Sequence, residues 1–503
     1  MVIFGGTGDL SQRKLIPALF HLIREGFLSG ELRVLCVGQR PFTVDEYRDM
    51  IDKGAKGFIE PSLFDAAAWN AFVARLDYLS GIVADQNTYQ RLSDRLEAMR
   101  LEEGASADRM FYLSTPPSAA PVIVEGLAAA GLVKEDLGWS RIVVEKPFGQ
   151  DLDSATKLNA QIAHVCDEHQ VYRIDHYLGK ETVQNILVFR FGNSLFEPLW
   201  NRNHIDFVEI TATETLGIGN RGRYYEEAGA LRDMVTNHLL QLLSLIAMEP
   251  PIAFDADAVR DQKSQLWNSI MPMTPEQIIQ RTARGQYGPG FAGGKRVLGY
   301  RDEENVAPDS RTETYAAVDF RIDNWRWAGV PFYLRTGKAL AAQVTEIAIH
   351  FKHPPLALFS HIRSENDLPL HCIEPNVITL RIQPNEGITL SFGAKQPGSE
   401  MRTSRVSMDF YYHETFNERL PSAYETLLLD VMRGNATQFL RRDGVEAQWR
   451  LITPILETWK ALSPPQFPNY SFGSDGPQVA DALLARNGHA WTPLVPAQDK
   501  SSA

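Results

Sequence analysis

A glycine-rich turn directly after a short apolar run is the feature that most constrains the fold of this chain. The run VIF at 2–4 leads into GGTGDLS at 5–11, and Leu15, Leu19 and Leu22 then recur on one stripe of a predicted helix. A strand, a glycine turn and a helix in this order predict a loop that wraps a dinucleotide phosphate. Glycines allow close backbone approach, and the helix amino end faces the anion. A turn that binds nothing has the same pattern, so the loop alone leaves both interpretations open.

Further apolar runs predict that parallel strands continue from this first unit. They are short and continuous, and they lie at 33–38, 110–113, 141–144 and 171–174. Helical patterns separate the last three runs, which is typical of strands that are buried on both faces. The expected fold is therefore a doubly wound α/β domain, which binds ligands at the carboxyl ends of its strands. Lys146 follows one of these strands and is expected at that edge.

The end of the second predicted strand bears on the cofactor. An NAD site usually places a carboxylate there to accept from the ribose hydroxyl, but this chain has Gly38, Gln39 and Arg40. An arginine at this position suits the 2′-phosphate of NADP. An ordinary surface arginine is the alternative.

The segment RIDHYLGKE at 173–181 gathers several chemically active side chains in one turn. Asp175 is suited to orient a histidine, whereas His176, Tyr177 and Lys180 are suited to hold a phosphate. A helix that starts near Gly179 would add its positive dipole end to the same anion site. A solvated polar turn before a helix is the competing interpretation.

After residue 200 the pattern changes to alternating strands. They are expected at 207–216, 315–322, 344–351, 377–382, 388–392 and 406–412. Few helices intervene, so a large antiparallel or mixed sheet is predicted. Glu214 falls on the apolar face of the first of these strands, together with Leu216, and therefore needs an ion-pair partner or a ligand. The tail from about Ser463 is rich in proline, glycine and serine and is expected to be loosely ordered.

An apolar helix is predicted at 230–243, and it carries Asp233 and His238. A histidine on such a helix is commonly a satisfied core residue. Beside a carboxylate, however, it would act as a general base near neutral pH, and Asp175 is a candidate for that carboxylate.

Composition limits the classes of partner. A net charge of −12 argues against a nucleic-acid or anionic-membrane surface. Three scattered cysteines, Cys36, Cys166 and Cys372, argue against a disulfide framework or a zinc site. No apolar run reaches the ~18 residues that a membrane-spanning helix needs. A cytoplasmic protein with more than one domain is expected.

Five segments together resemble the glucose-6-phosphate dehydrogenase family. They are GGTGDLSQRK at 5–14, EKPFG at 145–149, RIDHYLGKE at 173–181, RDMVTNHLLQLL at 232–243 and LRTGKAL at 334–340. The resemblance implies an NADP-binding Rossmann domain over residues 1–174. It also implies a β+α domain over residues 175–503, whose large, mainly antiparallel sheet forms a dimer interface.

The resemblance also implies a role for each matching residue. His238 would be the general base and Asp175 its carboxylate partner. Glu214 and Asp233 would bind sugar hydroxyls, and Lys146 would reach both substrate and nicotinamide. The sugar phosphate would be bound by His176, Tyr177, Lys180 and Lys338. The cofactor would be contacted by Gly5, Thr7, Gly8, Asp9, Leu10, Lys14, Arg40 and Lys146.

The implied reaction is oxidation of D-glucose 6-phosphate at C1 to the 6-phosphogluconolactone. It is the first step of the oxidative pentose phosphate pathway. The resemblance also implies that the enzyme is a homodimer or homotetramer and that it needs no metal.

Three departures qualify the resemblance. Gln343 stands where the family usually has a basic residue, Ser11 where it usually has alanine, and few residues precede Gly5.

Two other classes compete with this interpretation. A sugar oxidoreductase of the Gfo/Idh/MocA kind shares the Rossmann half and the EKP segment, but not the segment DHYLGK. A non-catalytic NADP-responsive sensor would keep the fold, although retention of Asp175, Lys146 and His238 together argues against it.

Overall fold

The computed structural model describes residues 1–29, 31–102, 106–356, 358, 374–399, 401–416, 418–463 and 465–495. The chain divides into two compact units, which are treated separately below. Unit 1 comprises Met1–Glu181, Pro251–Asp261 and Leu420–Glu446, and unit 2 comprises Thr182–Pro250, Gln262–Arg419 and Ala447–Ala503. Cys372 lies outside the described residues, whereas Cys36 and Cys166 are both free and buried.

Unit 1 is built on a six-stranded sheet with the order β3-β2-β1-β4-β5-β6, in which every pair is parallel. Its strands are β1 (Val2–Phe4), β2 (Val34–Gly38), β3 (Leu76–Ser80), β4 (Arg109–Leu113), β5 (Ser140–Glu145) and β6 (Val171–Ile174). This order is that of a dinucleotide-binding Rossmann sheet, with the change of direction between β1 and β4. The predicted doubly wound domain is confirmed, although β3 was not predicted.

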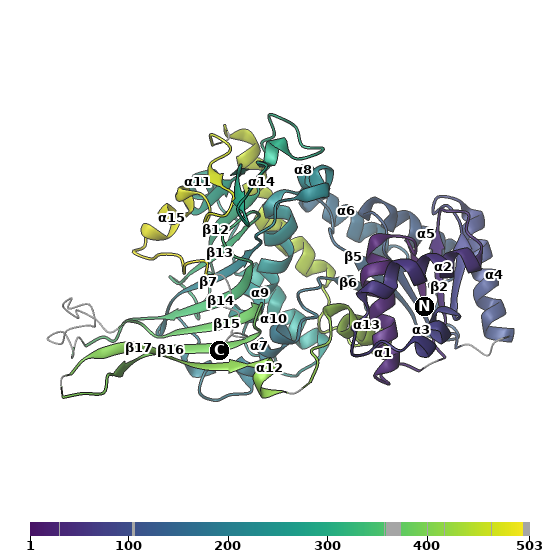
Figure 1. Cartoon of the computed structure of the whole chain (residues 1–503), viewed down its shortest axis with the longest axis horizontal. Coiled ribbons are helices and arrows are strands. Elements are labelled where there is room, and N and C mark those ends of the chain that lie inside the picture. The colour runs from purple at the N-terminus through teal and green to yellow at the C-terminus, as the bar shows by residue number, and fades with distance from the viewer. Residues whose placement is uncertain are drawn as a thin grey trace. The chain divides into compact units, whose positions relative to one another are not determined.

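Helices surround this sheet (Figure 1). They are η1 (Ser11–Leu15), α1 (Ile16–Arg24), α2 (Val44–Ala55), η2 (Lys56–Phe58), α3 (Ala66–Val73), α4 (Gln86–Glu102), η3 (Pro117–Ala119), α5 (Ala120–Ala129), α6 (Leu152–Ala163), η4 (Glu168–Gln170) and α13 (Ala423–Arg433). The predicted stripe of Leu15, Leu19 and Leu22 is buried, and it belongs to a core that also includes Leu427 and Val431 of α13. A helix from the distant end of the sequence thus completes the nucleotide-binding unit.

Unit 2 is built on an eight-stranded mixed sheet with the order β17-β16-β15-β14-β7-β13-β12-β8. Its strands are β7 (Ile205–Thr213), β8 (Thr282–Gly285), β12 (Tyr315–Arg321), β13 (Pro331–Gly337), β14 (Val344–Phe351), β15 (Val377–Gln383), β16 (Gly387–Lys395) and β17 (Thr403–Tyr411). The pair β13–β7 is parallel and the other pairs are antiparallel, which confirms the expected mainly antiparallel sheet.

Helices and small strands accompany this sheet. They are α7 (Glu181–Phe191), η5 (Glu197–Leu199), η6 (Gly219–Arg221), α8 (Gly222–Ala230), η7 (Leu231–Leu239), α9 (Leu240–Ala247), α10 (Ala256–Asn268), α11 (Pro275–Arg281), β9 (Tyr287–Gly288), β10 (Gly290–Ala292), β11 (Lys295–Val297), η8 (Tyr300–Asp302), α12 (Tyr412–Thr415), α14 (Arg442–Ala461), β18 (Tyr470–Ser471) and α15 (Gln478–Ala485). The predicted apolar helix at 230–243 is found, but residues 231–239 are wound as a π-helix. Such windings are frequent at functional sites.

Two expectations from the sequence are wrong. The first strand of unit 2 ends at Thr213, so Leu216 does not share its apolar face and is 70% exposed. The tail after Ser463 is ordered as far as it is described. It forms β18, which pairs with β9, and α15, whose Leu483 and Leu484 are buried in a core of unit 2. Within the described residues, no helix is long and apolar enough to cross a membrane.

Candidate active site

The glycine loop of unit 1 lies at the carboxyl end of β1, as its sequence predicts. The amides of Gly5 and Gly6 both donate to the carbonyl of Val37 in β2, and the amide of Gly8 donates back to Gly5. Gly5 has a φ of 81°, a conformation that favours glycine. A Cβ added to Gly6 would lie 2.5 Å from the Cβ of Cys36, so the loop packs directly on the neighbouring strand.

This loop fits a dinucleotide phosphate. It precedes the helix pair η1 and α1, and it stands next to the point where the strand order reverses. Of the predicted cofactor residues, Asp9, Lys14 and Arg40 are exposed, and Thr7 and Leu10 are half-buried. Arg40 follows β2, and its carbonyl accepts from the Tyr78 hydroxyl at 2.6 Å, which fixes the backbone there. Within the described part of the chain, the Arg40 guanidinium has no ion-pair partner.

Lys146 follows β5 at the same edge of this sheet, where its neighbour Glu145 anchors the backbone. The Glu145 carboxylate accepts from the hydroxyls of Tyr112 and Tyr424. Burial raises the pKa of Glu145. Two tyrosines from β4 and α13 therefore hold the residue that precedes Lys146.

The predicted phosphate turn follows β6. The Asp175 side chain is fully buried and accepts from the Tyr177 amide at 3.0 Å. The ammonium of Lys180 lies 4.7 Å from the centre of the Tyr177 ring, within the range of a cation–π contact. His176 lies nearly parallel to the Tyr424 ring, with centroids 6.4 Å apart. Unit 1 thus brings together the residues predicted from RIDHYLGKE.

Helix α13 supports this turn closely. A Cβ added to Gly179 would lie 2.5 Å from the carbonyl oxygen of Ala423 and 2.8 Å from Leu427. Only glycine allows this approach of the turn to the helix. The predicted helix after the turn begins at Glu181, as α7.

Glu214 and Lys338 meet in unit 2. Glu214 follows β7 and Lys338 follows β13, which is the strand parallel to β7, so both lie at the carboxyl end of this pair. The Lys338 ammonium is 2.5 Å from the Glu214 carboxylate, and the side chains are 7% and 38% exposed. Glu214 lies just beyond the end of β7 and is partly exposed, so its predicted place on the apolar face of the strand is wrong, although it does have the ion-pair partner that the sequence analysis expected. Among the described residues, Gln343 is exposed and lies beyond this turn.

Asp233 and His238 lie on the π-helix η7, which packs against β13 and β7. Asp233 is buried, and its carboxylate accepts from the Tyr224 hydroxyl at 2.9 Å. His238 is 1% exposed. Burial raises the pKa of Tyr225 well above its usual range, and the carboxylates of Asp233 and Glu214 add to that rise. Asp233 and Glu214 therefore both lie near Tyr225.

The candidate residues thus form one group in each unit. Asp175 belongs to unit 1 and His238 to unit 2. The sequence interpretation missed the tyrosines that support these groups: Tyr112, Tyr224, Tyr225 and Tyr424. The pair YY at 224–225 stands shortly before Asp233, and no local pattern distinguishes it from ordinary helix residues.

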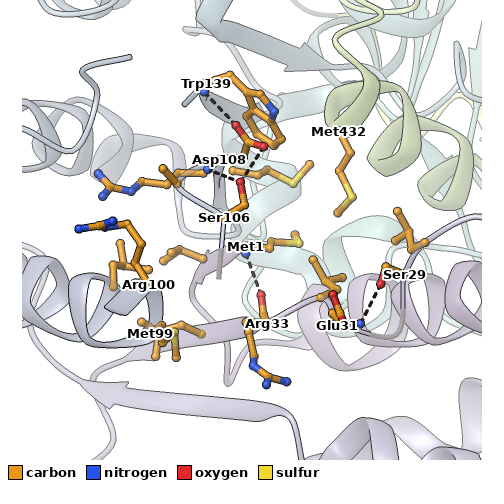
Figure 2. A pocket seen from close by; sticks show the side chains of 18 residues that line it. Met1, Ser29, Glu31, Arg33, Met99, Arg100, Ser106, Asp108, Trp139 and Met432 are labelled. Atoms are coloured by element: carbon orange, nitrogen blue, oxygen red, sulfur yellow. Dashed lines mark hydrogen bonds between the residues drawn. The ribbon is translucent and has the colours of Figure 1, made fainter. Parts of the chain in front are cut away.

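A separate cavity of about 630 Å³ opens at the amino ends of the unit 1 strands, opposite the end of the sheet that carries the glycine loop. Figure 2 shows Met1, Arg33 and Trp139 around it, each of them at the amino end of a strand. Its lining is mixed: it includes the apolar side chains of Met99 and Met432 and the charged side chains of Arg100 and Asp108. This cavity is distinct from the glycine loop, because that loop follows the carboxyl end of β1.

Comparisons with known proteins cover both units. Residues 2–185 match the family model of the glucose-6-phosphate dehydrogenase NAD binding domain, and residues 187–492 match that of the glucose-6-phosphate dehydrogenase C-terminal domain. The glucose-6-phosphate 1-dehydrogenase of Chlamydia pneumoniae is 47% identical over 500 residues, covering 98% of this chain and 96% of that protein. That of Mycolicibacterium smegmatis is 46% identical, with 97% and 96% covered.

Solved structures agree with these relatives. A glucose-6-phosphate dehydrogenase in complex with its substrate glucose-6-phosphate has a TM-score of 0.88 at 35% identity, and 98% of each chain is covered. The Mycobacterium avium glucose-6-phosphate 1-dehydrogenase has a TM-score of 0.81 at 38% identity, with the same coverage. Because sequence and fold agree over nearly its whole length, this chain belongs to the glucose-6-phosphate dehydrogenase family.

Proposed function

We propose that this protein oxidises D-glucose 6-phosphate at C1 to 6-phospho-D-glucono-1,5-lactone, with NADP⁺ as the hydride acceptor. This is the first step of the oxidative pentose phosphate pathway. The observation that carries the proposal is the family match over residues 2–185 and 187–492, which includes every predicted site residue. We assign residues 1–174 to cofactor binding and 175–503 to substrate binding and dimerisation.

In this proposal His238 is the general base. Its imidazole takes the proton of the C1 hydroxyl, and the Asp175 carboxylate stabilises the imidazolium that forms. The nicotinamide, when bound, accepts the hydride from C1. The burial of both side chains supports these roles, because a shielded base and carboxylate interact more strongly than in water.

The remaining residues hold the substrate. His176, Tyr177, Lys180 and Lys338 bind the phosphate, whereas Glu214 and Asp233 accept from sugar hydroxyls. Lys146 lies at the end of β5 and reaches both substrate and nicotinamide. The Glu214–Lys338 ion pair supports this division, because it holds both side chains in place before substrate arrives.

We infer a preference for NADP over NAD from the end of β2. No carboxylate stands there to accept from a ribose hydroxyl, and the exposed Arg40 is suited to a 2′-phosphate. Gly5, Thr7, Gly8, Asp9, Leu10 and Lys14 supply the remaining cofactor contacts.

We also infer a homodimer or homotetramer assembled through the large sheet. Strand β17 lies at its edge, and Val406 and Met408 are exposed along it. An exposed edge of this length favours association with another copy. The two described cysteines are free, which fits a reducing compartment and supports a cytoplasmic location.

The test is absorbance at 340 nm with purified protein, glucose 6-phosphate and either NADP⁺ or NAD⁺. We expect rapid reduction of NADP⁺ and much slower reduction of NAD⁺. Equal rates would support the reaction and overturn the cofactor preference. If glucose 6-phosphate reduces neither cofactor while unphosphorylated glucose does, the substrate assignment would be overturned. No reduction with any sugar would favour the sensor alternative.

A further inference from the structure

The turn that carries Lys338 is hydrogen-bonded to the residues just after β7 and to the C-terminal tail. The amide of Ala339 donates to Leu216, and the amide of Leu340 donates to Glu214. From the tail, the amide of Gly473 donates to the carbonyl of Ala339 at 2.8 Å. The tail therefore hydrogen-bonds directly to the backbone of a predicted substrate-binding turn.

This turn also has an unusual backbone conformation. Ala339 is fully buried and has a φ of 55°, in the left-handed region that side chains other than glycine rarely adopt. Such a conformation is unfavourable for a residue that carries a Cβ and persists only where its surroundings hold it. The direction of the Lys338 side chain consequently depends on the groups that hold the turn.

Tyr470 in β18 contacts the backbone of Lys338 directly. Its hydroxyl donates to the carbonyl oxygen of Lys338 at 2.9 Å and also lies 2.7 Å from the Thr314 hydroxyl. The amide of Lys338 in turn donates to the carbonyl of Thr314 at 2.9 Å. Thr314 and Tyr470 thus bracket the peptide groups on both sides of the Lys338 α-carbon.

The direction of these hydrogen bonds follows from counting hydrogens. The Tyr470 hydroxyl has one hydrogen, which it gives to Lys338, so the Thr314 hydroxyl must donate to Tyr470. The Thr314 oxygen then accepts from the Tyr287 amide at 3.0 Å. All residues in this series of hydrogen bonds are buried, and the hydroxyls of Tyr470 and Thr314 each both donate and accept. Such a fully satisfied buried network is rigid.

We propose that Tyr470, together with Thr314, is a positioning residue for substrate binding, because its hydroxyl fixes the turn that aims the Lys338 ammonium at the sugar phosphate. Through Tyr470, the tail after residue 463 therefore strengthens the binding of glucose 6-phosphate. This inference rests on the proposed function, since it requires that Lys338 bind the substrate.

The test compares Tyr470→Phe with Tyr315→Phe. Tyr315 provides a matched control, because its ring lies 5.9 Å from that of Tyr470 and is fully buried, while its hydroxyl has no hydrogen-bond partner among the described residues. Loss of the Tyr470 hydroxyl should raise KM for glucose 6-phosphate about fivefold, the effect of one buried hydrogen bond. KM for NADP⁺ and kcat should change by less than about twofold. Tyr315→Phe should leave all three constants unchanged.

Two further variants separate positioning from general stability. Thr314→Val should raise KM for the sugar as Tyr470→Phe does, whereas Thr314→Ser, which keeps the hydroxyl, should restore it. In a Lys338→Ala background, Tyr470→Phe should cause no additional rise in KM, because it acts through the lysine.

The outcomes separate this inference from the proposed function. An unchanged KM in Tyr470→Phe would overturn the inference, and so would an equal rise in Tyr315→Phe or a rise that persists without Lys338. Each of these results leaves the wild-type reaction intact. A wild-type protein that does not oxidise glucose 6-phosphate would instead overturn the proposed function.

Discussion

The ammonium of Lys338 lies 2.5 Å from the carboxylate of Glu214, although 124 residues separate them in the sequence. The parallel pairing of β7 and β13 brings them together, because both residues follow the carboxyl ends of these strands. Burying an ammonium group is costly unless it is paired, so this ion pair holds the buried Lys338 side chain in one position. In the proposed function, the same side chain binds the sugar phosphate.

Replacing Lys338 by glutamine should weaken substrate binding without affecting the cofactor. A hydrogen bond to a charged group contributes about 1.5–3 kcal/mol, so KM for glucose 6-phosphate should rise about 10- to 100-fold. Steady-state kinetics with each substrate varied in turn would measure this. Lys352→Gln is a matched control, because that side chain is exposed and donates to a backbone carbonyl of unit 2. A similar rise in KM for NADP⁺ would contradict the assignment of Lys338 to the sugar.

Replacing His238 by asparagine should remove the general base. General base catalysis contributes about 10²- to 10⁴-fold, so kcat should fall by that factor while the dissociation constant of glucose 6-phosphate changes little. Single-turnover kinetics and calorimetric titration would separate the two effects. His164→Asn, at the exposed end of α6, should retain wild-type kcat. A His238→Asn enzyme with wild-type turnover would refute this mechanism.

Replacing Arg40 by alanine should change the cofactor preference. Loss of a charged contact with the 2′-phosphate should raise KM for NADP⁺ about 10- to 100-fold and leave KM for NAD⁺ nearly unchanged. The ratio of kcat/KM for the two cofactors is the informative quantity. Arg91→Ala, on the exposed face of α4, controls for a general loss of positive charge. Equal losses with both cofactors would argue against a role in 2′-phosphate binding.

Asp430 in α13 should make stability depend on pH. Burial raises the pKa of its carboxyl group to about 6, although the Asn435 amide donates to it at 3.0 Å. Because the folded-state pKa lies above the unfolded value, the folded state binds more protons over this interval. Stability therefore falls as pH rises from about 4 to about 6, and the full penalty is present above that range.

Asp430→Asn should consequently stabilise the protein at pH 8. The gain in free energy of unfolding should be about 1 kcal/mol after allowance for solvent screening, and it should shrink as pH approaches about 4. Thermal midpoints of variant and wild type across this pH range would measure it. Asp49→Asn, on the exposed surface of α2, should show no such dependence. A gain that is independent of pH would point to helix propensity instead.

Local patterns predicted much of unit 1. The glycine loop, strands β1 and β2 and the helix with Leu19 and Leu22 all depend on neighbours in sequence, and the structure confirms them. Strand β3 was missed because Asp77 interrupts its apolar run, whereas the structure pairs that carboxylate with Arg95 of α4. Arg95 lies too far along the sequence from Asp77 for a local pattern to indicate that the two side chains pair.

Unit 2 was less predictable for the same reason. Strand β13 begins with a proline and contains Arg335, which is unusual in a central buried strand. The structure satisfies this arginine with the Thr211 hydroxyl and the carbonyl of Thr492, which comes from the tail. The tail in turn is ordered because it covers such buried groups, although its composition suggested a loose segment.

The sequence by itself determined the fold class, the family and the identity of the candidate site residues, because these depend on local spacing and on residue type. The tertiary structure alone decided which groups meet. It pairs Glu214 with Lys338, joins Tyr224 to Asp233 and places Tyr470 under the lysine turn. These contacts connect residues that share no local pattern, since their proximity comes from strand pairing and from the burial of polar groups that must find partners.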